Sequence, residues 1–179
     1  MDRLRIGVIG LGWFGEIHCE TIKGIANLEL AALCTRRPDR LAEQAQKFGV
    51  NKTYADYRDM LADKDIDAVS IVTMWDQHTD PAIAALEAGK HVFCEKSLVF
   101  KPEEVHALRA LANERSKQIL QVGLQRRYSR FYQTAKQMVD KGLLGDVTHV
   151  QAQWHRNGGW QFKKQDDPSR NKIANWRLY

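Results

Sequence analysis

Residues 4–15 read L-R-I-G-V-I-G-L-G-W-F-G, in which an apolar stretch runs directly into three glycines spaced as G-x-G-x-x-G. The apolar stretch predicts a strand over residues 4–9, and the residues after the glycines predict a helix over 13–24. A strand, a glycine-rich turn and a helix in this order form the unit that binds the pyrophosphate of a dinucleotide. An ordinary tight turn is the alternative, and the flanking strand and helix argue against it.

The three glycines, Gly10, Gly12 and Gly15, have different predicted tasks. Gly10 permits the tight turn, Gly12 lets a phosphate approach bare backbone, and Gly15 lets the helix pack close to the strand. The first N–H groups of the helix then face the phosphates, with the helix dipole behind them. We therefore predict cofactor contacts from these glycines and from Trp13 and Phe14 in the first helical turn.

The composition is that of an ordinary globular protein: of 179 residues, 44% are hydrophobic and 27% are charged. No apolar run reaches the roughly 18 residues of a membrane-spanning helix, so no membrane partner is expected. The N-terminus lacks the continuous apolar segment of a signal peptide. Cys19, Cys34 and Cys94 form no C-x-x-C pair, and we predict buried, reduced thiols in a cytoplasmic protein.

Charge is distributed unevenly along the chain. The net charge is +5, but residues 123–179 hold 11 Lys/Arg against 4 Asp/Glu, whereas residues 1–122 hold 16 against 18. A basic segment can bind nucleic acid, yet no helix-turn-helix spacing or zinc pattern accompanies this one. We therefore expect no nucleic-acid partner and assign the basic groups to a phosphate or an anionic partner subunit. The histidines have no metal-binding spacing to one another, so no metal site is expected.

The first 122 residues alternate predicted strands and helices, which indicates a parallel sheet. Further strands are expected at 28–34, 52–54, 67–73, 91–94 and 119–123, and further helices at 38–49, 81–89 and 102–116, with a helical turn capped by Asp56. This order predicts a doubly wound α/β dinucleotide-binding (Rossmann) domain over residues 1–122.

The pattern changes after Gly123. A helix is predicted over 129–141 and a strand over 147–154, and the last 25 residues have the composition of a long loop. One helix and one strand cannot bury a core of their own. We therefore expect residues 123–179 to be the truncated start of an α+β domain that binds substrate and forms homo-oligomers.

The predicted end of the second strand bears on the choice of cofactor. In proteins of this fold that prefer NAD, a carboxylate about 20 residues after the glycines binds the ribose 2′-hydroxyl. Thr35 and Arg36 occupy that place here, and a guanidinium suits a 2′-phosphate. We predict NADP as the preferred cofactor and NAD as the other; the alternative is that Arg36 and Arg37 are solvated surface charges.

Ligands of such sheets bind at the carboxyl ends of the strands, where two segments carry candidate reactive groups. These are T-M-W-D-Q-H at 73–78 and C-E-K-S at 94–97. Lys96 could take the proton of a carbinol as a hydride leaves for a nicotinamide, and burial in a cleft can lower the pKa of a lysine. Glu95 could orient Lys96. A surface Glu–Lys pair is the alternative.

Four segments resemble the glucose–fructose oxidoreductase / inositol dehydrogenase (Gfo/Idh/MocA) family. They are G-V-I-G-L-G-W-F-G at 7–15, A-I-A-A-L-E-A-G-K-H-V-F-C-E-K at 82–96, Q-V-G-L-Q-R-R-Y at 121–128 and G-L-L-G-D-V at 142–147. The resemblance implies a lysine that contacts both substrate and nicotinamide, here Lys96 with Glu95 beside it. It also implies cofactor contacts from Thr73, Trp75 and His78, and it agrees with NADP at the strand end.

The chain departs from the family pattern in two ways. Ser97 stands where the E-K-P motif has its proline, and Met74 stands where the preceding loop has one. The D-x-x-x-H-type motif, whose histidine acts on substrate in the family, does not occur in the chain. We name Arg126 and His155 as the candidate substrate contacts.

These observations predict an NAD(P)-dependent oxidoreductase. The hydride would pass between a nicotinamide cofactor and a CH–OH group of a sugar, a cyclitol or a related polyol. Two other functions stay open: a nucleotide-dependent glycosidase that oxidises its sugar transiently, and a non-catalytic NAD(P)-binding regulatory module.

Overall fold

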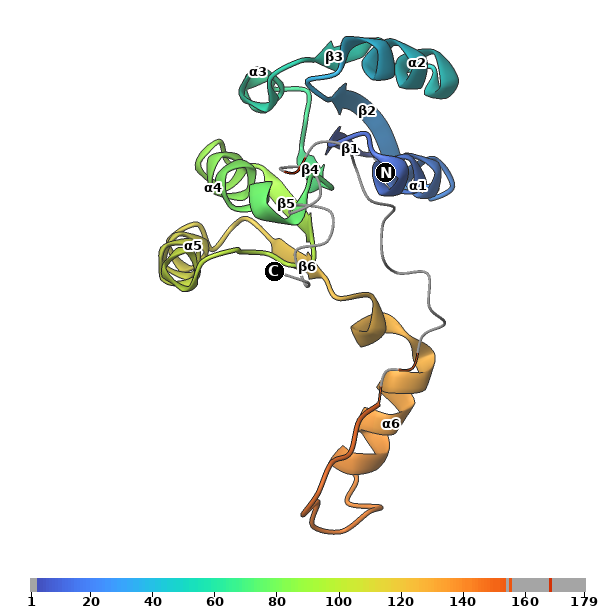
Figure 1. The fold of residues 1–179 in the computed structure, drawn as a ribbon, viewed down its shortest axis with the longest axis vertical. Helices are drawn as coiled ribbons and strands as arrows, with labels where there is room; N and C mark the ends of the chain where they lie inside the picture. The colour runs from blue at the N-terminus through green and yellow to red at the C-terminus, as the bar shows by residue number, and fades with distance from the viewer. Residues whose placement is uncertain (1–2, 154, 156–167, 169–179) are drawn as a thin grey trace. The chain divides into compact units, whose positions relative to one another are not determined.

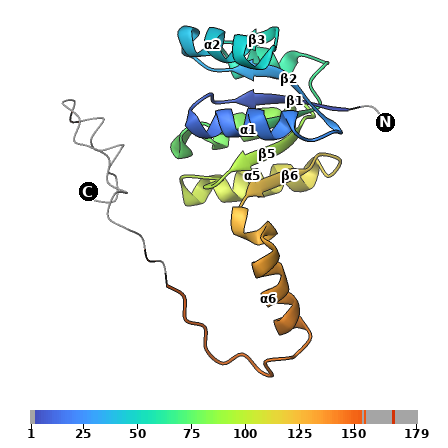
Figure 2. The ribbon, with the colours of Figure 1, turned by 90° about the vertical axis from the view of Figure 1, so that its right-hand side faces the viewer.

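The computed structural model describes residues 3–153, 155 and 168. The chain divides into two units, Met1–Ser129 and Arg130–Tyr179. The first unit contains a single sheet of six parallel strands in the order β3-β2-β1-β4-β5-β6 (Figures 1 and 2). The strands are β1 (Leu4–Ile9), β2 (Leu28–Cys34), β3 (Lys52–Tyr54), β4 (Ala68–Ile71), β5 (His91–Glu95) and β6 (Leu120–Gly123). The strand order reverses between β1 and β4, which confirms the doubly wound prediction.

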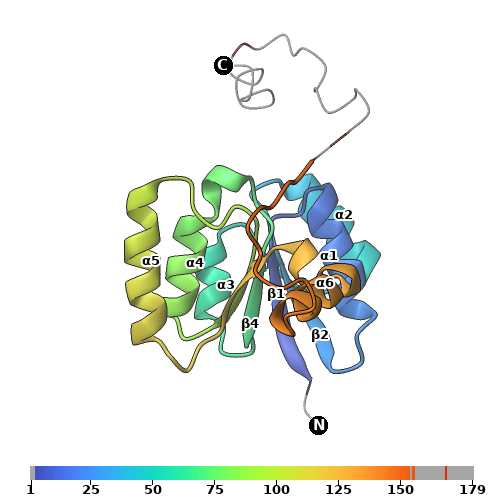
Figure 3. The same cartoon turned by 90° about the horizontal axis from the view of Figure 1, so that it is seen from below.

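Helices cover both faces of the sheet, as Figure 3 shows. Helices α1 (Trp13–Lys23) and α2 (Pro38–Phe48) lie on one face, and α3 (Tyr57–Ala62), α4 (Thr79–Glu87) and α5 (Pro102–Glu114) lie on the other. Alternate residues of β1 serve the two layers: Val8 packs in the cluster with α1, and Ile9 packs in the cluster with α3, α4 and α5. The remaining elements are two 3-10 helices, η1 (Trp75–Gln77) and η2 (Gln125–Tyr128), and helix α6 (Arg130–Asp140) of the second unit.

Local sequence signals set several helix ends. Pro38 begins α2, where its fixed φ suits the first turn, and Gly49 ends it with φ +67°, a left-handed conformation that glycine adopts without strain. Asp56 caps α3 by accepting a hydrogen bond of 2.9 Å from the Arg58 N–H. These ends were predictable because each depends on residues adjacent in the chain.

The predicted strand over 147–154 is wrong. Residues 147–153 have no regular secondary structure, and residue 154 lies outside the described residues. A strand needs a neighbouring strand to satisfy its backbone N–H and C=O groups. All six described strands belong to one sheet, and none of them pairs with residues 147–153. The long loop predicted after residue 154 also falls outside the described residues, apart from positions 155 and 168.

The three cysteines are buried and free, as predicted. Burial raises the pKa of each thiol, Cys19, Cys34 and Cys94, to about 12. Because the thiolate is the reactive form, these side chains act as packing groups rather than as nucleophiles. Within the described part of the chain, no helix has both the length and the apolar character needed to cross a membrane.

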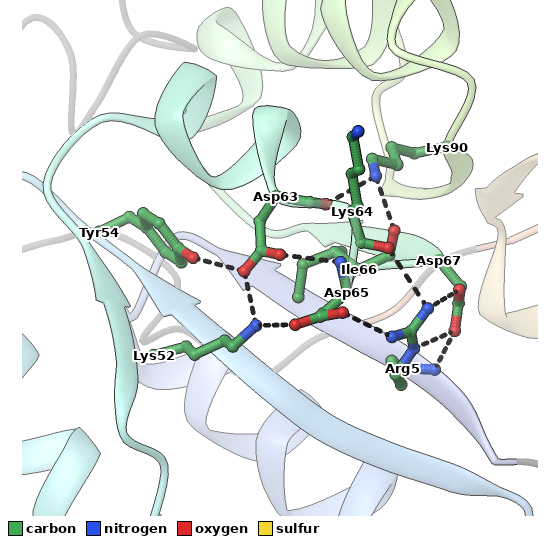
Figure 4. Close-up of polar contacts among 9 residues, drawn as sticks. All are labelled: Arg5, Lys52, Tyr54, Asp63, Lys64, Asp65, Ile66, Asp67 and Lys90. Carbon is green, nitrogen blue, oxygen red and sulfur yellow. Dashed lines mark hydrogen bonds and ion pairs between the residues drawn. The ribbon is translucent and has the colours of Figure 1, made fainter.

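A polar network fastens residues 63–67, which lead from α3 into β4 at the amino end of the sheet (Figure 4). Lys52 Nζ donates to Asp63 Oδ2 at 2.8 Å and to Asp65 Oδ2 at 2.7 Å. Arg5 donates to both oxygens of Asp67, at 3.0 and 2.8 Å. The hydrogen bond from Lys52 holds the pKa of Asp63 well below its usual range, and that from Arg5 lowers the pKa of Asp67 to about 2.

Lys90 is the buried member of this amino-end network. Only 9% of the residue is exposed, and its Nζ donates to the carbonyl oxygens of Asp63 and Ile66, each at 2.8 Å. Ammonium groups bond strongly to carbonyls, and a carbonyl left without a partner in a protein interior is costly. Lys90 therefore joins the start of β5 to the turn before β4.

Replacing Lys90 with Met should lower the free energy of unfolding by about 2–4 kcal/mol, since two carbonyl oxygens lose their donor. Urea denaturation followed by circular dichroism measures the change. Lys64→Met is the control: Lys64 lies on the same turn, is exposed, and should change the free energy by less than about 0.5 kcal/mol. Equal effects of the two substitutions would contradict the role given to Lys90.

Candidate functional site

The glycine turn joins the carboxyl end of β1 to helix α1, and two of its glycines are required by close backbone contacts. Gly10 has φ +101°, and its N–H donates to the Cys34 carbonyl at 2.9 Å. A Cβ on Gly10 would lie 2.6 Å from the Val72 carbonyl oxygen, and a Cβ on Gly15 would lie 2.0 Å from that of Gly10. These contacts let α1 begin directly against the strand end.

Gly12 is different, because a Cβ at this position would meet nothing within 4 Å. It is the N-cap of α1 and has no side-chain capping bond. The N–H groups of the first helical turn, which includes Trp13 and Phe14, have no partner inside the helix and attract an anion. The open space at Gly12 lies beside them. This arrangement leaves room for an anion at the start of α1. The pyrophosphate contact that the glycine spacing predicts stays a prediction.

Two arginines of α2 and its N-cap hold the glycine turn from its other side. Arg37 Nη2 and Arg40 Nε both donate to the Leu11 carbonyl, at 3.3 and 3.0 Å. Arg40 also pairs with Glu16 of α1, whose other oxygen accepts from Lys47. The sequence analysis missed this support; the basic residues that follow the second strand were its only signal.

The end of β2 carries the residues predicted to choose the cofactor. Thr35 is half-buried, and its backbone N–H donates to the Tyr54 carbonyl at 3.2 Å. Arg36 is exposed, and its Nη2 donates to Gln77 Oε1 of η1 at 3.1 Å. The Arg36 side chain therefore extends toward the loop after β4, across the place where the strand order reverses.

His78 links the loops that follow β4 and β5. Its side chain is buried, with the residue 1% exposed, and its ring nitrogens lie 2.7 Å from the Ser97 carbonyl oxygen and 3.0 Å from that of Thr73. Thr73 Oγ1 also donates to the Gln77 carbonyl at 3.0 Å. His78 thus fixes both loops through their backbones. Its predicted contact with a cofactor stays a prediction.

Trp75 and Lys96 project from these two loops. The Trp75 ring lies 4.8 Å from that of Phe100, centroid to centroid. Lys96 is exposed, and the peptide bond that joins it to Ser97 is cis. The neighbouring Glu95 carboxylate is mostly buried, with 13% of its side chain exposed; one oxygen accepts from the Lys96 N–H at 3.3 Å and the other lies 3.5 Å from His18 Nε2.

The two candidate substrate residues lie in different units. Arg126 belongs to η2, which follows β6 directly, so its backbone continues from the strand next to β5. His155 belongs to the second unit, where its Nε2 lies 3.0 Å from Gln153 Oε1. No group of three or more metal-ligating side chains occurs among the residues that the structure describes.

The first unit thus places a glycine turn after β1, an arginine after β2 and a Glu–Lys turn after β5, all at the carboxyl edge of one sheet. Comparison with known proteins agrees with this arrangement. Residues 4–124 match the model of the Gfo/Idh/MocA oxidoreductase family, described as an oxidoreductase family with an NAD-binding Rossmann fold. The chain belongs to this family, as the resemblance of its motifs predicts.

Individual relatives extend the comparison. The chain is 38% identical over 142 residues to a myo-inositol 2-dehydrogenase of Thermotoga maritima, covering 79% of this chain and 42% of the relative. It is 31% identical to a glycosyl hydrolase family 109 protein of Shewanella baltica, covering 100% of this chain and 40% of the relative. Scyllo-inositol dehydrogenase of Lactobacillus casei, solved with NAD(H) and scyllo-inositol, aligns with a TM-score of 0.78 at 35% identity, covering 82% and 44% of the two chains. The chain therefore spans less than half the length of these proteins.

Two alanine substitutions separate the tasks of the glycines. Gly12→Ala should change the free energy of unfolding by less than about 1 kcal/mol, because the site is open, yet weaken NAD(P)H binding by about tenfold or more where a phosphate must approach. Gly15→Ala should instead destabilise the fold by about 2 kcal/mol or more, because its Cβ meets a backbone oxygen. Calorimetric titration and urea denaturation measure the two effects. A Gly12→Ala variant that binds the cofactor normally would contradict the pyrophosphate assignment.

Proposed function

We propose that this chain provides the cofactor site and the acid–base residue of an NAD(P)-dependent oxidoreductase that acts on a CH–OH group of a cyclitol, a sugar or a related polyol. The observation that carries the proposal is the Glu95–Lys96 turn, which follows β5 at the same edge of the sheet as the glycine turn after β1. Ligands of such sheets bind at this edge. Relatives of similar sequence bear the names of inositol dehydrogenases, which supports a cyclitol.

Lys96 is the group with the chemistry that the reaction needs. When bound, the nicotinamide accepts or returns the hydride. The Lys96 amine takes the hydroxyl proton as the alcohol carbon loses its hydride, and gives the proton back in the reverse direction. Lys96 is exposed, so its amine is accessible to a bound cofactor and substrate. Glu95 orients the turn that carries Lys96, through the bond to its backbone N–H.

Lys96→Ala should reduce turnover of a cyclitol by about a hundredfold or more, the scale expected for loss of a general acid or base. The dissociation constant of the cofactor and the melting temperature should stay close to those of the parent, because Lys96 supports no other described residue. Lys117→Ala, at an exposed lysine before β6 and so at the opposite end of the sheet, is the matched control. If Lys96→Ala retains turnover within a factor of a few, the assignment is wrong.

We also propose that NADP is preferred to NAD. Thr35 and Arg36 stand at the end of β2, where a carboxylate would bind a ribose 2′-hydroxyl. Within the described part of the chain, the Arg36 guanidinium bonds to the neutral amide oxygen of Gln77, a partner that it can exchange for a 2′-phosphate. Arg37, by contrast, is engaged with the Leu11 carbonyl.

Arg36→Ala should weaken NADPH binding by about 1–3 kcal/mol, the scale of a charge-assisted hydrogen bond, and leave NADH binding unchanged. Calorimetric titration with both cofactors measures this. Arg109→Ala, at an exposed arginine of α5 on the opposite face, controls for net charge. Equal affinity of the parent chain for NADPH and NADH would remove the basis for the proposal.

A nucleotide-dependent glycosidase is the second candidate. Its support is the alignment of the whole chain with the Shewanella baltica protein. A glycosidase of this kind oxidises the sugar only transiently, so its cofactor returns to the starting state at each turnover. Accumulation of reduced cofactor with a free polyol supports the dehydrogenase, whereas release of sugar from a glycoside without net reduction supports the glycosidase.

We further propose a cytoplasmic location, because the buried, free thiols are typical of proteins in a reducing compartment. We assign homo-oligomer formation to the residues after 123, as the family resemblance implies.

A further inference from the structure

Helix α1 carries a histidine that the proposed reaction does not use. His18 Nδ1 lies 2.9 Å from Ser70 Oγ of β4, and its Nε2 lies 3.5 Å from Glu95 Oε1 at the end of β5. The imidazole therefore spans from the cofactor helix to two strands of the sheet. Both ring nitrogens face polar atoms, and the side chain is only 15% exposed.

Aromatic neighbours fix the plane of this ring. Phe14 lies edge-on to His18 with centroids 5.1 Å apart, and the Phe93 ring lies 5.6 Å away in a tilted orientation. These two ring contacts limit the rotation of the His18 side chain and help to direct its Nε2 toward Glu95.

The hydrogen-bonding capacities of the partners assign the protons. An ionised Glu95 only accepts, so a hydrogen on His18 Nε2 makes the 3.5 Å contact between them favourable. In the neutral imidazole Nδ1 then accepts, and the Ser70 hydroxyl donates to it. The carboxylate thus favours the tautomer with hydrogen on Nε2, and the Ser70 hydroxyl, which can donate or accept, adapts to it.

The Glu95 carboxylate is held from three directions. His18 faces one oxygen, and the Lys96 N–H donates to the other at 3.3 Å. The third constraint is Gly123, which pairs with Glu95 across β5 and β6: a Cβ there would lie 2.5 Å from Glu95 Oε1. Only glycine leaves room for the carboxylate in this position.

We propose that His18 is a positioning residue, which holds the Glu95 carboxylate and, through it, the Lys96 turn in register with the cofactor helix. The inference rests on the proposed function, because that function is what makes the position of Lys96 important for the reaction. Displacing a reacting group by about 1 Å can cost up to a hundredfold in rate. Because His18 lies one turn after the N–H groups that face the phosphates, it ties the position of Lys96 to that of the cofactor.

The same three residue types also make up hydrolytic triads, but their arrangement differs. In such a triad the serine faces Nε2 and the carboxylate faces Nδ1, whereas here Ser70 faces Nδ1 and Glu95 faces Nε2. Ser70 is also only 3% exposed. His18, Ser70 and Glu95 therefore form a support.

Two substitutions of His18 separate positioning from packing. The amide nitrogen of Gln occupies nearly the place of Nε2 and can still donate to Glu95, whereas the amide of Asn reaches only the place of Nδ1. His18→Gln should keep Lys96 in place and His18→Asn should release it. His106→Asn, at an exposed histidine of α5, is the matched control. Gly123→Ala is a second route, because its Cβ displaces the flexible Glu95 carboxylate while position 18 keeps its histidine; that Cβ would also lie 3.1 Å from Phe93 Cζ, so that ring must shift slightly.

The first measurement needs no turnover: hydrogen exchange and chemical shift of the Lys96 backbone amide, by NMR on this chain. We expect exchange to be about tenfold faster or more in His18→Asn and Gly123→Ala, and near the parent rate in His18→Gln and His106→Asn. The second is the split of kinetic constants in the active protein: kcat about ten- to a hundredfold lower in His18→Asn with cofactor affinity unchanged, and rescued in His18→Gln.

An unchanged Lys96 amide in both His18→Asn and Gly123→Ala would overturn the inference, as would equal effects of Gln and Asn at position 18. Failure of the proposed function has a different signature, namely full turnover by Lys96→Ala. In that case the amide measurement still decides whether His18 holds the turn.

Discussion

The close approach of helix α1 to the end of β1 is the constraint on which the rest of the site depends. It exists because Gly10 and Gly15 have no side chains: a Cβ on Gly15 would lie 2.0 Å from the Gly10 carbonyl oxygen. The approach turns the first N–H groups of α1 toward the place where the strand order reverses. It also brings His18, one turn further along, against β4 and β5 instead of into solvent. One backbone contact thus creates both the anion site and its connection to Lys96.

The loops at this edge of the sheet are fixed by hydrogen bonds to their backbones. Arg37 and Arg40 hold the carbonyl of Leu11, and His78 holds those of Thr73 and Ser97. Loops that carry function bury little apolar surface, so packing alone does not define their shape. Side chains that bond to the backbone carbonyls of these loops fix the loop conformation. The side chains of the loops themselves are then available to a ligand.

Features encoded by adjacent residues could be predicted, and those that depend on distant partners could not. The glycine spacing, Pro38 at the start of α2 and the cap at Asp56 depend on neighbours in the chain. The supporting roles of His18 and His78 depend on residues 52 and 19 positions away, which no local pattern reveals. The prediction of a strand over 147–154 was wrong for a related reason. Alternating apolar and polar residues indicate which side chains would share a face of a strand, but not whether a second strand is present to pair with it.

The two ends of the sheet divide stability from function. At the amino end, Lys52 pairs with Asp63 and Asp65, and Arg5 pairs with Asp67, so each of these five charges has an ionic partner. At the carboxyl end, Lys96 is exposed, and Arg36 bonds to a neutral amide. Charges without ionic partners add little to folding, yet they can bind an anion or accept a proton. Glu95 is directed to His18 and to backbone, so its carboxylate does not pair with the Lys96 amine, and under the proposed function that amine stays available to the substrate.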